Sequence, residues 1–205
     1  MSEALDGVTG GATLLAATGV TADISDVTTT LVITDLNGGA LTIGTISDTV
    51  LDSVDLSGTI GAINLATTGG LTQSLVAITM GAGADTIKFA QSSPSQTNAD
   101  TIQGYNGAAG HATLQFGTTR VLLGSQFGTT ETVASGFDTS DTSVANFLAH
   151  IIGGGTAGVA AYYDGTNTWV ASVKGTGDLT NVVELVGVHL TSVSTTASAT
   201  VLHIG

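Results

Sequence analysis

Short runs of β-branched and apolar residues, separated by glycine-rich turns, recur through the first half of the chain and restrict its fold more than any other feature. Apolar residues alternate with small polar ones in these runs, which is the pattern of a half-buried β-strand. Turn signals such as Asn37-Gly38-Gly39 and Gly69-Gly70 stand between them. The runs cover residues 30–34, 40–44, 59–65 and 73–80. The sequence therefore predicts an all-β fold, either a β-sandwich or a parallel β-solenoid or β-roll-like ladder, and the pattern does not choose between them.

One short helix is predicted near residues 141–152. Its apolar residues recur at helical spacing, possible N-cap residues precede it, and a run of three glycines ends it. The apolar positions are Val144, Phe147, Leu148, Ile151 and Ile152. We expect this helix to pack on the sheet, with His150 in a structural role.

Three parts are predicted along the chain. Residues 1–27 form an N-terminal segment that is flexible or available for donation as a strand to another copy. Residues 28–136 form a β-rich ladder. Residues 137–205 form a C-terminal β module, in which Asp164-Gly165-Thr166-Asn167 predicts a hairpin between two apolar runs.

The charge balance excludes some classes of partner. The chain has 16 acidic and 3 basic residues and a net charge of −13, which argues against nucleic acid and favours a cation as partner. There is no cysteine, so bound metal is a candidate stabiliser in place of disulfides. No N-terminal secretory signal and no apolar run of membrane-spanning length is seen, so we expect a protein that does not span a membrane.

The motif with the clearest chemistry is Gly81-Ala-Gly83-Ala-Asp85-Thr-Ile87, and Asp100-Thr-Ile102 repeats its second half. It is similar to the tail of the calcium-binding nonapeptide G-G-x-G-x-D-x-U-x, with Met80 in place of the first glycine. In such a turn, glycines adopt positive φ and expose carbonyl oxygens, while aspartate supplies a hard anionic oxygen. We predict Ca²⁺ ligands at Gly81, Gly83, Asp85 and Asp100; the alternative is an ordinary glycine turn before a strand.

A second calcium site is predicted in a turn-rich stretch that carries Asp48, Asp52 and Asp55. Backbone carbonyls could complete an oxygen cage around these carboxylates. The alternative is that they are exposed turn residues.

Two stretches carry a family resemblance. Residues 80–117 resemble the RTX region of surface proteins secreted by type I systems, and residues 137–205 resemble the C-terminal module of RTX-containing bacterial S-layer proteins. The resemblance implies type I export with an uncleaved C-terminal signal, and calcium-triggered folding and self-assembly outside the cell. It matches Asp85 and Asp100 to the family's calcium carboxylates, and Gly81 and Gly83 to its carbonyl-donating glycines.

The chain departs from the family in three ways: Met80 breaks the double glycine, only two partial copies of the motif are present, and the chain is short for an S-layer subunit. A thin filament or a matrix fibre would suit so small a subunit.

We therefore expect an extracellular structural protein at a cell surface or in a matrix, with copies of itself as the main partner and a cell-surface polysaccharide as a second candidate. No nucleophile, metallohydrolase or phosphate-binding motif is seen, so we predict that the chain is not an enzyme. The main alternative is a secreted RTX adhesin or carbohydrate-binding module, in which Tyr162, Tyr163 and Trp169 would form an aromatic platform. We expect instead that these rings complete the core.

Overall fold

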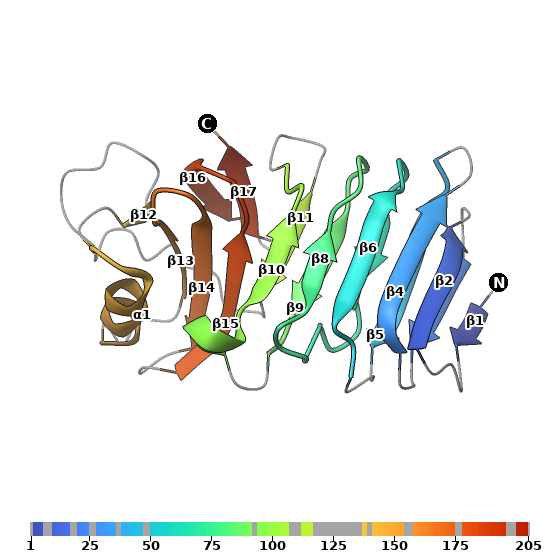
Figure 1. Cartoon of the computed structure of the whole chain (residues 1–205), viewed down its shortest axis with the longest axis horizontal. Helices are drawn as coiled ribbons and strands as arrows, with labels where there is room; N and C mark the ends of the chain where they lie inside the picture. Colours follow the sequence, from blue (N-terminus) through green and yellow to red (C-terminus); the bar gives the residue numbers. More distant parts are fainter. Residues whose placement is uncertain are drawn as a thin grey trace.

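The computed structural model of the chain describes residues 2–5, 10–16, 20–24, 28–35, 38–46, 50–91, 94–106, 112–116, 137–138, 141–153, 158–174, 178–195 and 200–204. Strands make up 50% of the structure, which also has one short helix, and they wind into a parallel β-solenoid of about 3 turns. The all-β prediction is confirmed, and of the two architectures that it left open the structure has the solenoid (Figure 1).

The strands form two sheets that run along the length of the molecule (Figure 1). The first sheet contains β1 (Ser2–Leu5), β3 (Val20–Ile24), β5 (Leu41–Ile46), β7 (Ile63–Leu65), β9 (Thr86–Phe89), β11 (Thr113–Phe116), β17 (Thr200–Ile204) and β16 (Leu190–Thr195), in that order. The second contains β12 (Phe137–Asp138), β13 (Gly158–Tyr163), β14 (Thr168–Lys174), β15 (Asp178–Leu185), β10 (Asp100–Gln103), β8 (Ala77–Thr79), β6 (Ser53–Gly58), β4 (Thr28–Asp35) and β2 (Gly10–Ala16). A short 3₁₀ turn, η1 (Gln96–Asn98), precedes β10.

The interior is a stack of aliphatic side chains with one layer for each turn. In the second sheet, Leu31 pairs with Val54, Val54 with Ile78, and Ile78 with Ile102, and each of these side chains is at most 1% exposed. Because side chains of a strand alternate between its two faces, this register brings the apolar residues of β4, β6, β8 and β10 into one core. Each such side chain contributes roughly 1.5–3 kcal/mol by burial. The repeated β-runs are therefore stable only as a stack.

The C-terminal part continues both sheets, which differs from the three-part division predicted above. β15 pairs with β10 in parallel, β17 pairs with β11, and Val183 and Ile102 belong to the same core cluster. The described residues of the 1–27 segment also lie within the solenoid, as β1, β2 and β3. The described structure is thus one continuous stack, closed at one end by the antiparallel strands β13, β14 and β15.

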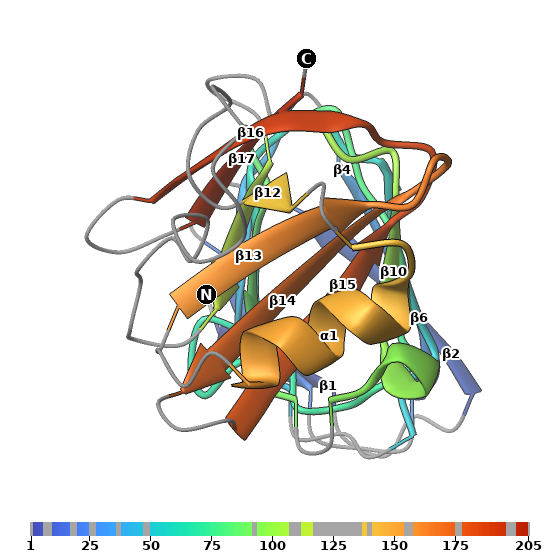
Figure 2. The same ribbon diagram turned by 90° about the vertical axis from the view of Figure 1, so that its left-hand side faces the viewer.

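The helix α1 (Val144–Gly153) lies over the strands β13 and β14 at this end of the stack (Figure 2). The predicted helix is confirmed, with its start at Val144. Its buried residues include Phe147, whose ring stacks on that of Tyr162 with 5.6 Å between centroids. His150 Nδ1 lies 3.2 Å from Asp141 Oδ2, so its contact is with the residues that lead into the helix.

Among the described residues, no helix has the length and apolar content needed to cross a bilayer.

Candidate functional site

Each of the two Asp-Thr-Ile motifs lies at the corner of the solenoid where a strand begins. One leads into β9 of the first sheet, and the other begins β10 of the second sheet. Asp85 precedes β9, and its side chain is 0% exposed. Its Oδ1 accepts a hydrogen bond from the backbone N–H of Ile63 (3.0 Å), and its Oδ2 accepts one from that of Gly81 (3.1 Å). Ile63 is 22 residues earlier in the chain and one turn away in space. The carboxylate of Asp85 thus joins two successive turns.

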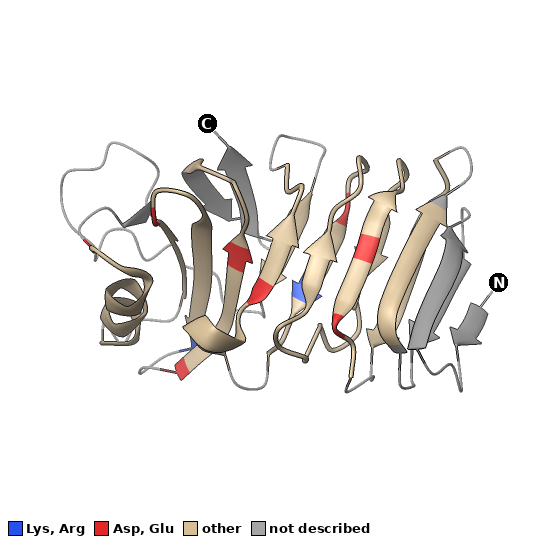
Figure 3. Cartoon of the chain, viewed as in Figure 1, with Lys and Arg blue, Asp and Glu red and all other residues tan. Residues whose placement is uncertain are grey.

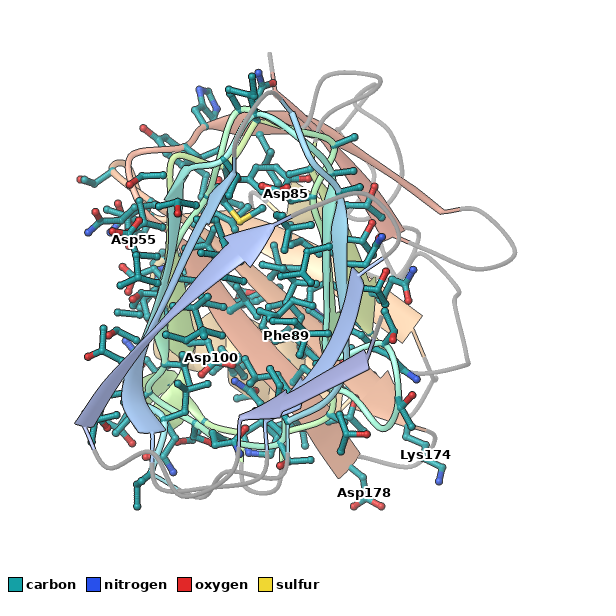
Figure 4. The ribbon with its side chains drawn as sticks, turned by 90° about the vertical axis from the view of Figure 1, so that its right-hand side faces the viewer. Asp55, Asp85, Phe89, Asp100, Lys174 and Asp178 are labelled. Atoms are coloured by element: carbon teal, nitrogen blue, oxygen red, sulfur yellow. The ribbon has the colours of Figure 1, made fainter. Side chains whose placement is uncertain are left out.

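Asp100 makes the corresponding contact in the other sheet. It begins β10, it is 0% exposed, and its Oδ1 accepts a hydrogen bond from the N–H of Val76 (2.9 Å), 24 residues earlier. Its Oδ2 accepts a second one from Nε2 of Gln91 (2.8 Å). Burial raises the pKa of Asp100 to about 7, although the hydrogen bonds from Val76 and Gln91 oppose the rise. Figure 4 shows both carboxylates within the ring of strands and apart from each other.

The glycines of the motif have a different role from the predicted one. Gly81 and Gly83 are not among the glycines with positive φ. A Cβ placed on Gly83 would lie 2.0 Å from the carbonyl oxygen of Gly61, and one on Gly61 would lie 2.2 Å from that of Gly39. A Cβ on Gly81 would lie 2.1 Å from Oγ1 of Thr59. These positions need glycine because successive turns approach too closely at this corner for any side chain.

The other predicted calcium residues do not form a common site with these. Asp48 lies outside the described residues, and Asp52 is exposed. Asp55 is partly exposed, and hydrogen bonds from the side chain and then the N–H of Ser57 lower its pKa. In the part of the chain that the structure describes, no three His, Asp or Glu side chains are placed to hold one ion.

The motif residues therefore do not fit the calcium site that the family resemblance implies. A calcium site needs several oxygen atoms aimed at one point. Here the carboxylates of Asp85 and Asp100 lie in different sheets and accept N–H groups, and Gly81 and Gly83 serve close packing. Calcium-dependent folding and assembly stay a prediction.

The aromatic hairpin residues lie in the core rather than on a platform, as expected for Tyr162 and Trp169. These two are 6% and 7% exposed and belong to the cluster under α1. Nε1 of Trp169 donates to Oδ2 of Asp164 (2.9 Å), and Tyr163 stacks on His189 with 4.1 Å between ring centroids. The aromatic platform of the adhesin alternative is therefore not formed.

A buried polar joint connects the solenoid to its C-terminal end, and no sequence pattern predicts it. Gln91, 7% exposed, donates its backbone N–H to Oδ1 of Asn181 (3.0 Å). Its side chain accepts the N–H of Val182 at Oε1 (2.7 Å) and donates from Nε2 to the carbonyl of Val182 (3.0 Å) and to Asp100. Both partners in β15 are about 90 residues away in sequence. The only local signal is a polar residue two positions after the last residue of β9.

Beside this joint is a cavity of about 460 Å³. The end of β9, the residues Ala90, Gln91 and Pro94, the end of β14 and the beginning of β15 are among the segments that line it. Two of the chain's three basic residues, Lys88 and Lys174, are among the lining residues. Cavities of this size are typical of small-molecule sites.

A scan against protein-family models finds no matching family, and searches of curated proteins and of solved structures find no match.

Proposed function

We propose that the protein is an extracellular structural protein whose solenoid is the building unit of a self-assembled surface layer or filament. The observation that carries this proposal is the difference between the two ends of the stack. At the C-terminal end, α1 and the antiparallel strands cover the last turn (Figure 2). At the other end, β1 and β2 are the edge strands of their sheets, and each pairs with a strand on one side only among the described residues.

Edge strands carry rows of N–H and C=O groups that can pair with another chain. Proteins usually prevent this with charged side chains and prolines, and this chain has 3 Lys and Arg residues and 1 Pro. A second copy is the partner that matches such an edge best, because its own β1 and β2 carry the same rows of N–H and C=O groups. This contact between like edges closes into a dimer, and growth into a filament or layer would need a second contact elsewhere on the solenoid.

The central experiment is purification in chelator, followed by stepwise calcium addition while circular dichroism and light scattering are recorded, with electron microscopy of the product. The proposal predicts ordered sheets or filaments at millimolar calcium. A monodisperse monomer under these conditions would refute it. If the protein folds and assembles already in chelator, calcium is not required, and the structural role is still supported.

A pair of matched variants tests whether the edge is the contact. Thr13→Lys places a charge on the edge strand β2, opposite Val32 in the register, and Thr42→Lys places the same charge on the inner strand β5. We expect Thr13→Lys to slow assembly and Thr42→Lys to leave it near the wild-type rate, because only the former charge would lie at the contact. Equal assembly by all three proteins would show that the contact lies elsewhere.

A further inference from the structure

The cavity beside the polar joint combines positive charge with an apolar wall in a chain of strongly negative charge. Lys88 is half-buried on β9, and Lys174 is exposed at the end of β14 (Figure 3). Among the described residues neither ammonium group makes an ion pair, and Nζ of Lys88 donates to the carbonyl of Thr67 at 3.3 Å. The chain has only three basic residues and a net charge of −13, yet two of the three line this one cavity. An anion is the ligand that they would attract.

Two acids lie close to this cavity. Asp100 accepts a hydrogen bond from the lining residue Gln91, and Asp178 lies opposite Lys174 in the register of β14 and β15. Figure 4 shows the side chains of Lys174 and Asp178 at the lower edge of the molecule. The carboxylate of Asp178 partly offsets the charge of Lys174. Removal of the Asp178 carboxylate should therefore strengthen the binding of an anion.

The neutral polar groups of the wall are already engaged. Asn181 and Ser172 are each 2% exposed, and Nδ2 of Asn181 donates to Oγ of Ser172 (2.9 Å). Oγ1 of Thr180 donates to the carbonyl of Ser172 (3.1 Å). The side chain of Gln91 is fully used in the joint. Recognition must therefore come mainly from the two ammonium groups and from apolar contact.

The apolar part of the lining decides between a simple anion and an organic one. Pro94, Phe116, Val173 and Leu179 line the cavity together with the lysines. Inorganic phosphate gains nothing from such a wall, whereas a sugar ring buries its C–H face against apolar side chains. The volume of about 460 Å³ is ample for one or two sugar rings.

We propose that this cavity binds an acidic sugar, with the carboxylate at Lys88 and Lys174 and the ring against the apolar wall. The site would give the proposed surface assembly a point of attachment to an acidic polysaccharide. The inference does not rest on assembly, because binding is measured on unassembled protein.

The test is a titration of dilute, non-assembling protein at low salt with D-glucuronate, D-glucose and, separately, inorganic phosphate. Binding is measured from the changes in NMR chemical shifts. We expect saturable shifts near residues 88, 174 and 179–181 with glucuronate. Binding of glucose should be at least about tenfold weaker, since the charged contact is missing. Added salt should weaken glucuronate binding because both lysines face solvent.

Three variants identify the charges that act. Lys88→Gln and Lys174→Gln should each weaken glucuronate binding about tenfold, and Asp178→Asn should strengthen it. Lys88 and Lys174 carry no core packing role, and an unchanged circular dichroism spectrum would confirm that each variant is folded. Unchanged affinity in both lysine variants would overturn the proposal. Equal affinity for phosphate and glucuronate would overturn the sugar as ligand, and absence of any saturable shift would overturn the site itself.

Discussion

Raising the pH should destabilise this protein through one buried carboxyl group, that of Asp100. Burial raises its pKa from 3.8 to about 7 in the folded state. Between these two values the folded protein holds a proton that the unfolded chain has lost. The stability that this proton gives is fully present below about pH 4 and is lost as the pH rises through about 7. The difference between the two pKa values corresponds to about 4 kcal/mol.

The assay is urea unfolding of the wild type and of Asp100→Asn at a series of pH values. Other carboxylates also titrate, so the informative quantity is the difference in unfolding free energy between the two proteins. The variant carries a constant penalty, because its amide would place one N–H group against Nε2 of Gln91, which is held by Val182. We expect the difference between the proteins to shrink by roughly 4 kcal/mol from pH 4 to pH 8. A difference that does not change with pH would refute the reasoning.

Two further predictions concern the contacts between turns. Asp85→Ala should lower the unfolding free energy by about 2–5 kcal/mol, because the buried N–H group of Ile63 and the partly buried one of Gly81 would lose their acceptor. Asp55→Ala removes a partly exposed carboxylate and should change the unfolding free energy by less than about 1 kcal/mol in the same denaturant titration. Wild-type stability of Asp85→Ala would mean that water replaces the carboxylate. Gly83→Ala should prevent the native stack from forming, because its Cβ would lie 2.0 Å from the carbonyl oxygen of Gly61, and we expect no cooperative thermal transition. Gly153→Ala is the control: no atom lies within 4 Å of its Cβ, so the melting temperature should be unchanged. A Gly83→Ala protein that melts like the wild type would show that the turns can separate at this corner.

The strands, the helix and the hairpin could be predicted because their signals are local. Alternation of apolar residues indicates a strand in any fold, and the spacing of Val144, Phe147 and Ile151 needs no knowledge of partners. The choice between sandwich and solenoid could not be made in this way. It depends on the register of Leu31 with Val54 and of Val54 with Ile78, and nothing in one run of residues specifies which later run will lie beside it.

The motif could be found in the sequence, but the positive φ expected for its glycines is not observed at Gly81 or Gly83. A glycine beside an aspartate at the start of a strand suits either a calcium turn or a tight junction between turns. The difference lies in what stands one turn away. For Gly83 that neighbour is the backbone of Gly61, and for Asp85 it is the N–H of Ile63. The joint at Gln91 was missed for the same reason, since its partners are about 90 residues away.

The same joint has a consequence for the order in which the chain folds. Contacts between neighbouring turns join residues 22–24 positions apart and can form early, as loops of that length close at modest entropic cost. Gln91 finds its partners in β15 only when that strand has arrived. The hydrogen bond from Gln91 to Asp100 joins residues nine positions apart and does not need β15. Because a chain is synthesised from its N-terminus, the contacts between Gln91 and β15 should form after those between the earlier turns.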